Sequence, residues 1–217
     1  MCIKVYVFKV RTSNWRSVYQ AVLLGGNKPI AVDLREMHKI EAGSVVVFPG
    51  VGSISSLAEE VCYALSPSEM RKWIESNEIK IIGICLGFQF LFLRSFENPL
   101  VECLGIFPTE VKSVYEVPKP SVGWKGLIEL NVGGEKNDLD VHLSNNKFYF
   151  THSFGVVASE VDKRSGKIYS YLPAGASNEI VAAVLYGNYV GYQFHPEKSG
   201  GSGIRLLAAS IQYLSDV

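Results

Sequence analysis

The sequence predicts an α/β fold with a mostly parallel central sheet, flanked by helices and extended by an antiparallel β region in the second half. Two apolar runs at residues 45–48 and 79–84 are rich in valine and isoleucine, as expected for buried parallel strands. Helical segments follow both runs, and this alternation is typical of a doubly wound sheet. After residue 107, short strand-like segments follow one another, separated by turn signals such as those at residues 133–135 and 187–188.

The first half of the chain contains the clearest start and stop signals. Asn14 is placed to cap the first helix, Gly-Gly-Asn at residues 25–27 ends it, and Pro67 opens a later helix. An apolar stretch after Cys85 is also expected to be helical. The elements expected here are strands at 3–8, 45–48 and 79–84, and helices at about 14–24, up to 65, and at 67–77.

The second half is expected to be mainly β. Its expected strands lie at 110–114, 126–130, 147–150, 155–157, 168–172, 180–185 and 189–194, and a last helix at 203–214. The chain has no internal repeat, low-complexity segment or proline-rich linker. We therefore expect residues 1–217 to form a single domain.

Composition narrows the classes of protein to consider. The 217 residues include 47% hydrophobic residues, an ordinary share for a globular protein, and 21 basic residues balance 21 acidic ones. Zero net charge gives no electrostatic footprint for nucleic acid or for an anionic membrane. The longest apolar stretch, residues 81–93, is too short to span a bilayer, and the first residues lack the layout of a signal peptide.

The four cysteines do not form a disulfide or metal framework. Cys2, Cys62, Cys85 and Cys103 include no C-x-x-C pair, and no histidine stands at a metal-ligand spacing from any of them. We expect neither a metal nor a cofactor. A free reactive thiol suits a reducing compartment, so a cytoplasmic location is expected.

One of these cysteines stands in a pattern that favours nucleophilic chemistry. Cys85 lies between Gly83 and Gly87, directly after a strand-like run and before an apolar, helical run. This is the thiol counterpart of the nucleophile elbow, whose tight turn leaves no room for side chains beside the nucleophile. A helix N-terminus below the sulfur would favour its thiolate form. The alternative is that Cys85 is a small buried core residue.

A cysteine nucleophile needs a proton carrier, and His195 is the candidate. Glu197 follows two residues later, and on extended chain such positions face the same way. Its carboxylate can therefore orient the imidazole, as the third member of a Cys-His-Glu triad. Because Cys85 and His195 are 110 residues apart, only the fold can bring them together.

These motifs resemble those of the class I glutamine amidotransferases. The resemblance rests on Gly-Ile-Cys-Leu-Gly-Phe-Gln at 83–89 and Gln-Phe-His-Pro-Glu at 193–197, and it extends from about residue 3 to 214. Pro-Gly-Val-Gly at 49–52 is similar to the loop of the glutaminase subunits of imidazole glycerol phosphate synthases, enzymes of histidine biosynthesis. Further matches are Ser13-Asn14, Gly123-Trp124, residues 149–153 and residues 197–200.

The resemblance implies a role for each matching residue. Cys85 would attack the carboxamide of glutamine to form a thioester, with His195 carrying protons and Glu197 orienting it. Backbone N–H groups near Val51, Gly52 and Leu86 would form the oxyanion hole, and the Val51 peptide would need reorienting with a partner's help. Residues that would contact the substrate glutamine are Gln89, Glu97, His152 and Ser153.

Each of these roles has a structural alternative. Gln89 could only satisfy backbone groups, Glu97 could be a solvated acid, and His152 could be a core histidine bonded to a carbonyl. Trp124 could be a core aromatic residue, while His38 and His142 are expected at the surface.

The resemblance also implies a partner. In this family ammonia passes through a dry channel to a (β/α)8-barrel cyclase/synthase subunit, which makes imidazole glycerol phosphate and AICAR, and the two subunits form a heterodimer. Asn14, Trp124, Tyr149 and Lys198 match partner-facing positions. Without the partner, the subunit would be a poor glutaminase because its oxyanion hole is incomplete.

The chain departs from the family pattern at several positions. Ser121 and Lys125 replace a histidine and an asparagine near the partner-facing region, Phe88 replaces methionine, and Phe154 replaces a ring with a polar tip. Arg11 and Thr12 stand where glycine is frequent. None of these changes removes the nucleophile, base or orienting carboxylate, but they leave the identity of the partner open.

Four hypotheses follow from the sequence. The first is a glutaminase that supplies ammonia for imidazole glycerol phosphate synthesis. The second keeps the glutaminase but directs ammonia to sugar amidation for surface polysaccharides. The third is a non-catalytic scaffold for a barrel partner, which the intact Cys85, His195 and Glu197 disfavour. The fourth is an unrelated cysteine hydrolase, which Gln89 and the loop at 49–52 disfavour.

Overall fold

The computed structural model of the protein describes residues 3–115, 119–130, 136–162 and 166–217. Within them, the main sheet has eight strands in the order β2-β1-β3-β4-β13-β12-β11-β8. The strands are β1 (Val5–Phe8), β2 (Pro29–Val32), β3 (Val45–Gly50), β4 (Lys80–Cys85), β8 (Ile128–Glu129), β11 (Lys167–Tyr171), β12 (Ile180–Tyr186) and β13 (Tyr189–Tyr192). Pairs from β2 to β13 are parallel, and pairs from β13 to β8 are antiparallel. The predicted architecture is confirmed, with the antiparallel strands extending the same sheet.

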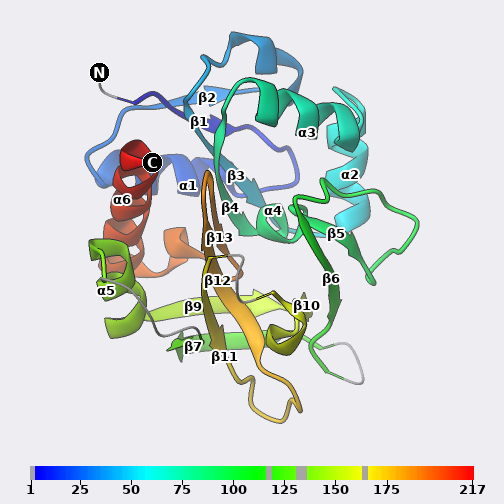
Figure 1. Ribbon diagram of the computed structural model, residues 1–217, viewed down its shortest axis with the longest axis vertical. Helices are drawn as coiled ribbons and strands as arrows, with labels where there is room; N and C mark the ends of the chain where they lie inside the picture. Colours follow the sequence, from blue (N-terminus) through cyan, green and yellow to red (C-terminus); the bar gives the residue numbers. More distant parts are fainter. Residues whose placement is uncertain (1–2, 116–118, 131–135, 163–165) are drawn as a thin grey trace.

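Two small sheets lie beside the main one. The first has the order β10-β6-β5 and the second pairs β7 with β9. Their strands are β5 (Phe92–Ser95), β6 (Phe107–Ser113), β7 (Ser121–Gly126), β9 (Lys147–His152) and β10 (Phe154–Gly155). Figure 1 shows the β7–β9 pair below the lower ends of the central strands.

Helices cover both faces of the main sheet (Figure 1). One layer holds α1 (Trp15–Leu24), α5 (Asp138–Asn145) and α6 (Gly200–Asp216), and the other holds α2 (Ile54–Cys62) and α3 (Pro67–Ser76). Strand β3 shows the period of two that this layering requires. Val45 and Val47 pack with the α1 layer, whereas Val46 and Phe48 pack with the α2 layer. Short 3-10 helices complete the chain: η1 (Leu34–Lys39), η2 (Ala158–Glu160) and η3 (Pro196–Lys198).

Local capping explains where several helices begin. Ser66 and Glu69 form a reciprocal capping box at α3, where Pro67 is the first helical residue as predicted. Ser53 accepts a hydrogen bond from the Ser56 amide and caps α2. Asn14 occupies the N-cap position of α1, but its side chain makes no capping bond. Its side-chain amide donates instead to Glu197.

The helix expected after Cys85 is much shorter than predicted. Helix α4 (Leu86–Gln89) is a single turn, and the chain then enters β5. The carbonyls of Phe90, Leu91 and Phe92 accept hydrogen bonds from the loop at 104–107 instead of from a continuing helix. Residues 86–92 of this apolar run are all buried, so the run has no amphipathic period that could have predicted where the helix ends.

Other elements were missed or shortened. The sequence prediction did not include β2, β5, β7 or α5, and the strand expected at 126–130 is reduced to Ile128–Glu129. Helix α5 carries a recognisable signal, because Asn137 and Asp140 form a capping box at its start. The turn at 187–188 joins β12 to β13 as predicted, whereas the one at 133–135 lies outside the described residues.

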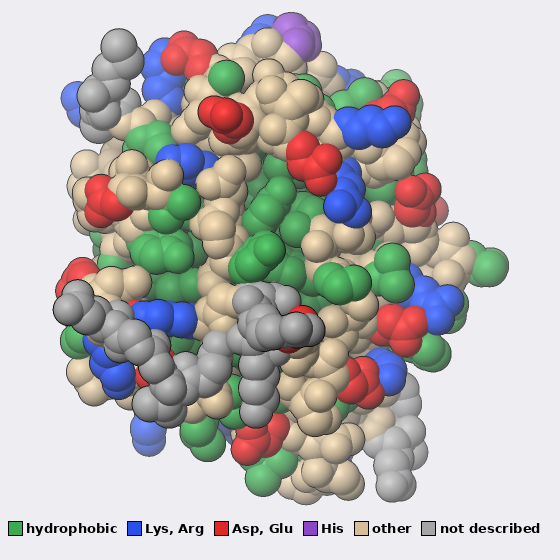
Figure 2. Space-filling model, in the orientation of Figure 1, with side chains coloured by type: hydrophobic (Ala, Val, Ile, Leu, Met, Phe, Trp, Pro, Cys, Tyr) green, Lys and Arg blue, Asp and Glu red, His purple; other side chains and the backbone are tan. Residues whose placement is uncertain are grey.

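Figure 2 shows one face of the molecule, on which acidic and basic side chains are interspersed and form no patch of a single sign. This distribution agrees with the balanced composition of 21 basic and 21 acidic residues. Within the described ranges, no helix is both long enough and apolar enough to cross a bilayer.

Candidate active site

Cys85 ends the central strand β4 beside the end of β3. In the parallel register, Cys85 pairs with Gly50, so the thiol and the loop at Val51 and Gly52 lie at the same edge of the sheet. This is the carboxyl edge of the parallel strands, where α/β folds place their sites. The loop that follows β3 and the thiol that ends β4 therefore lie side by side at this edge.

The backbone at Cys85 has the strained conformation of a nucleophile elbow. Its φ of 52° and ψ of −105° lie in a region that side-chain-bearing residues rarely adopt, at a cost of about 1–3 kcal/mol. The turn also presses α4 against β3, since a Cβ on Gly87 would lie 2.0 Å from the carbonyl oxygen of Phe48. Glycine at 87 is thus required by a backbone-to-backbone approach.

The helix N-terminus expected below the sulfur is present, but its helix is a single turn. A helix macrodipole arises from many aligned peptides, and α4 contains only four residues. Individual backbone N–H donors must therefore provide the positive potential that a long helix would provide. Leu86 is the first residue of α4, where a backbone N–H has no partner within its own helix.

A cavity of about 420 Å³ opens over the sulfur. It gathers the predicted site residues from both halves of the chain, apart from Glu197, Trp124 and Tyr149. The lining is Asn14, Val51, Gly52, Cys85, Leu86, Gln89, Glu97, Pro120, Thr151, His152, Ser153, Phe154, His195 and Lys198. A larger hollow of about 680 Å³ lies between the end of α1, α5 and α6, but no thiol lines it.

His195 and Glu197 lie behind the sulfur as a hydrogen-bonded pair. The Nδ1 of His195 is 2.7 Å from Oε1 of Glu197, and both side chains are almost completely buried. Asn14 donates from Nδ2 to the same carboxylate oxygen at 2.6 Å. The predicted partner-facing residue Asn14 therefore also contacts the carboxylate that orients the histidine.

The charges of this pair favour an imidazolium facing a carboxylate. Burial alone would lower the pKa of His195, but hydrogen bonds with Cys85 and then Glu197 raise it to about 9. Burial likewise opposes ionisation of Glu197, yet contact with His195 and with Asn14 lowers its pKa below the ordinary value. At neutral pH His195 thus holds a proton that it can deliver.

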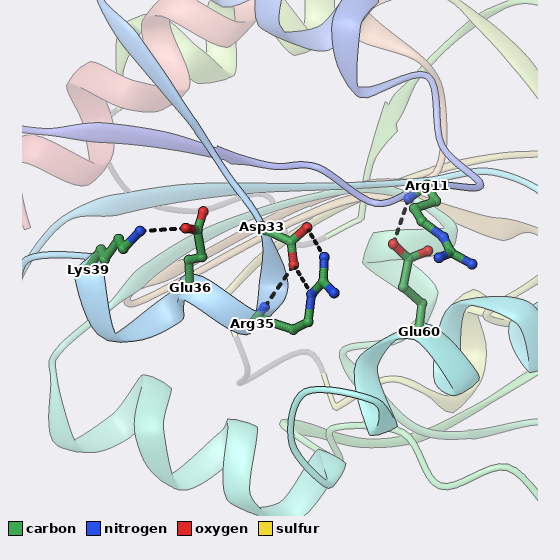
Figure 3. Close-up of polar contacts among 6 residues, drawn as sticks. All are labelled: Arg11, Asp33, Arg35, Glu36, Lys39 and Glu60. Atoms are coloured by element: carbon green, nitrogen blue, oxygen red, sulfur yellow. Dashed lines mark hydrogen bonds and ion pairs between the residues drawn. The ribbon is translucent and has the colours of Figure 1, made fainter.

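The loop that carries Asn14 is fixed at a second point, shown in Figure 3. The backbone N–H of Arg11 donates to Oε1 of Glu60 on α2 at 2.7 Å. The contact uses the main chain, so the arginine that stands in place of the family's frequent glycine does not disturb it. Nearby, Arg35 makes a two-point ion pair with Asp33 and lowers the pKa of that carboxyl to about 2. This exposed pair adds little stability.

Gln89 and Glu97 point into the cavity while holding backbone groups. Gln89 donates from Nε2 to the Phe154 carbonyl at 2.6 Å and to Oε1 of Gln193 at 3.0 Å. Oε2 of Glu97 accepts from the Ile54 amide at 3.1 Å, at the start of α2, and burial raises the pKa of this carboxyl. Glu97 is therefore a half-buried, hydrogen-bonded carboxylate and not a fully solvated acid.

His152 is a buried histidine with both ring nitrogens engaged. Nδ1 lies 2.8 Å from the Phe154 carbonyl, which can only accept, and Nε2 lies 2.6 Å from the Tyr171 hydroxyl. Burial lowers the pKa of His152 to about 4, so the neutral ring donates from Nδ1 and accepts at Nε2. The ring is therefore that of a core histidine bonded to a carbonyl, and His152 also lines the cavity.

The buried His152 predicts a pH dependence of stability. Between its ordinary pKa of 6.5 and its folded value of about 4, only the unfolded chain binds the proton, so stability falls as pH drops through this window. The loss would reach about 3 kcal/mol at most. Urea unfolding at pH 7 and at pH 4.5 should show a smaller pH-dependent loss in His152→Gln than in the native chain. Equal losses in the two proteins would contradict the assignment.

Of the four positions predicted to face a partner, Trp124 and Lys198 are exposed, whereas Asn14 and Tyr149 are half-buried. Trp124 on β7 pairs with Tyr149 on β9, with ring centroids 6.1 Å apart, and 54% of Trp124 is exposed. Trp124 is therefore not a core aromatic. Ser121 turns the other way: it is buried, with Oγ 3.2 Å from the Tyr171 hydroxyl, so this departure does not alter the exposed face.

The structure accommodates two other departures from the family pattern, Phe88 and Phe154. The Phe88 ring fills the space over Gly191, where a Cβ would lie 2.1 Å from it, and contacts Phe92 edge-on at 5.0 Å. Phe154 contributes its carbonyl to Gln89 and His152, so the polar tip usual in the family is not needed for these bonds.

Sequence reasoning missed some polar side chains around the sulfur. Nε2 of Gln193 lies 3.8 Å from Sγ of Cys85, and the Tyr171 hydroxyl supports His152. Gln193 carried a usable signal, because it stands two residues before His195 on extended chain. Tyr171 carried none, since only the fold brings β11 near the site. Across the described ranges, no group of three or more histidine, cysteine or acidic side chains is arranged to hold a metal ion.

Comparison with known proteins agrees with this geometry. The sequence model of the family "Glutamine amidotransferase class-I" matches residues 16–211. The HisH subunit of imidazole glycerol phosphate synthase from Bacteroides fragilis strain YCH46 is 34% identical over 210 residues, covering 94% of this chain and 97% of the relative. HisH from Archaeoglobus fulgidus is 34% identical over 199 residues, covering 89% and 90%.

The fold is also found among solved structures. A crystal structure of a glutamine amidotransferase superposes with a TM-score of 0.64 at 18% identity, covering 98% of this chain and 99% of the other. The match of the family model over most of the chain is independent of that likeness. This chain belongs to the class I glutamine amidotransferases.

Proposed function

We propose that the chain is a glutaminase subunit that hydrolyses glutamine to glutamate and ammonia and passes the ammonia to a (β/α)8-barrel synthase subunit. The observation that carries the proposal is that Cys85 and His195 line one cavity, with Glu197 hydrogen-bonded to the histidine. The relatives named HisH subunit of imidazole glycerol phosphate synthase, which are 34% identical, support imidazole glycerol phosphate as a product of the partner, and AICAR is the second product in this proposal. Residues 1–217 would act as one domain.

The proposed reaction has two halves. The Cys85 sulfur attacks the carboxamide carbon of glutamine, and the tetrahedral oxyanion is held by backbone N–H groups at Leu86 and at Val51 or Gly52. His195 gives its proton to the nitrogen, the carbon–nitrogen bond breaks, and ammonia leaves a thioester. His195 then takes a proton from water, whose oxygen attacks the thioester and releases glutamate and Cys85.

The cavity has polar groups suited to binding glutamine itself. Glu97 presents a half-buried carboxylate to the space, suited to an α-ammonium group, and the Gln89 amide lies near the sulfur. Ser153 and the backbone at His152 would lie along the substrate. In this proposal, these contacts would orient the carboxamide of glutamine over Cys85.

The proposed partner would cover the mouth of the cavity. Aromatic rings are favoured at protein interfaces, and the exposed Trp124 on β7 contacts the half-buried Tyr149 on β9, while Lys198 lines the cavity. A heterodimer of this kind would also hold the loop at Val51 and Gly52 in the state that completes the oxyanion hole. The isolated chain would therefore turn over slowly.

Glutamate release with and without a barrel partner tests this proposal. The native chain should hydrolyse glutamine slowly alone, and a cyclase/synthase barrel with its substrate should accelerate it by at least about tenfold. Asparagine in place of glutamine serves as the control substrate. Ammonia transfer to a nucleotide-linked sugar acceptor instead would redirect the proposal to surface-polysaccharide synthesis. No glutamine turnover with any barrel partner would refute it.

A further inference from the structure

Gln193 lies beside the nucleophile and has no role in the reaction as described so far. It follows β13 directly, and its backbone N–H donates to the Ala182 carbonyl at 2.9 Å. The residue is completely buried, so its amide can be satisfied only by protein groups or by a substrate. The nearest partner of its Nε2 is the Cys85 sulfur at 3.8 Å.

The orientation of the Gln193 amide is fixed by its neighbour. Its Oε1 accepts a hydrogen bond from Nε2 of Gln89 at 3.0 Å, and Gln89 also donates to the Phe154 carbonyl at 2.6 Å. Rotating the Gln193 amide by half a turn would place its NH2 group against that of Gln89 and its oxygen against the sulfur. The NH2 group therefore faces Cys85.

We propose that Gln193 is a catalytic residue that donates a hydrogen bond to the sulfur of Cys85 whenever the sulfur is anionic. A bond to an anion is stronger than one to a neutral thiol, most of all in a buried site. It favours the thiolate that attacks glutamine. It also favours the thiolate that leaves when water cleaves the thioester. This consequence for glutamine hydrolysis rests on the proposed function, whereas the effect on the sulfur does not.

Alkylation of Cys85 measures the sulfur without using glutamine. Iodoacetamide reacts with the thiolate by displacing iodide, and peptide mass spectrometry follows Cys85 and the exposed Cys62 separately. Two variants remove the donor: Gln193→Met is apolar, and Gln193→Glu keeps the shape but places a carboxylate oxygen near the sulfur. Tyr192→Phe is a matched control, because it removes a buried hydroxyl on β13 that bonds Ser210 rather than the site.

The expected result is specific to one sulfur. In Gln193→Met the pH midpoint of Cys85 alkylation should rise by about one unit, so the rate measured well below the native midpoint should fall by about tenfold. Gln193→Glu should show a larger effect, while Cys62 in every variant and Cys85 in Tyr192→Phe keep the native rates. An unchanged midpoint at Cys85 in both folded Gln193 variants would overturn the inference. So would a general rise that Cys62 shares.

The hydrolysis assay separates this inference from the proposed function. With the barrel partner present, Gln193→Met should lower kcat about tenfold and leave KM within about twofold, since the donor acts on the sulfur rather than on bound glutamine. A raised KM at native kcat would assign Gln193 to substrate binding and overturn the inference. If the native chain lacks glutaminase activity but the alkylation shift is present, the proposed function fails and the inference stands.

Discussion

Replacing Cys85 with alanine is expected to lower glutamine hydrolysis by at least about a thousandfold, both in the isolated chain and with the partner. The substitution removes the one thiol among the residues that line the cavity, while His195 and Glu197 remain. Background hydrolysis by water would persist, because the oxyanion donors are backbone groups. The measurement is glutamate release under saturating glutamine.

This prediction has a matched control in the same chain. Cys62→Ala changes an exposed thiol on α2 and should retain the native rate. Alanine at 85 must still adopt a φ near 52°, so unfolding in urea should show that Cys85→Ala remains folded. Appreciable turnover by folded Cys85→Ala would show that another group is the nucleophile.

Gly87→Ala is expected to destabilise the fold by about 3 kcal/mol or more. The added Cβ would lie 2.0 Å from the Phe48 oxygen, an atom of the central strand β3 that cannot rotate away. Helix α4 would have to shift off β3, carrying the elbow with it, so glutamine hydrolysis should be lost as well. Urea unfolding of the two proteins measures the first effect.

The control for this substitution is Gly126→Ala at the end of β7. A Cβ at Gly126 would have no atom within 4 Å, so its stability should stay within about 0.5 kcal/mol of the native chain. If Gly87→Ala were as stable as Gly126→Ala, the close packing of the elbow against β3 would be wrong.

Local signals in the sequence were sufficient for the parts of the fold that depend on local physics. The valine- and isoleucine-rich runs became β3 and β4, and Pro67 opened α3. The helix after Cys85 failed because its carbonyls are taken by a loop some 15 residues later, a long-range event with no trace in the apolar run. The edge strand β2 has a half-exposed pattern that is too irregular for a periodic signal.

The site residues likewise fall into those that local motifs predict and those that only the fold brings together. Cys85 and His195 were predictable because an elbow and a His-Pro-Glu segment are contiguous motifs. The bond from Asn14 to Glu197 was not, since a helix-capping role accounted for Asn14 locally and the two residues are 183 positions apart. Trp124 required its strand partner Tyr149 before exposed and buried faces of β7 could be distinguished.

The backbone of Tyr149 holds the loop of the histidine at two points. Its carbonyl accepts from the His195 amide at 2.9 Å, and its own amide donates to Oγ of Ser199 at 3.0 Å, while its ring meets Trp124 outside. A single residue thus connects the outer aromatic pair to the backbone that carries the imidazole. A displacement of Trp124 and Tyr149 would therefore reach the backbone of His195 through one residue, without passing through the core of the molecule.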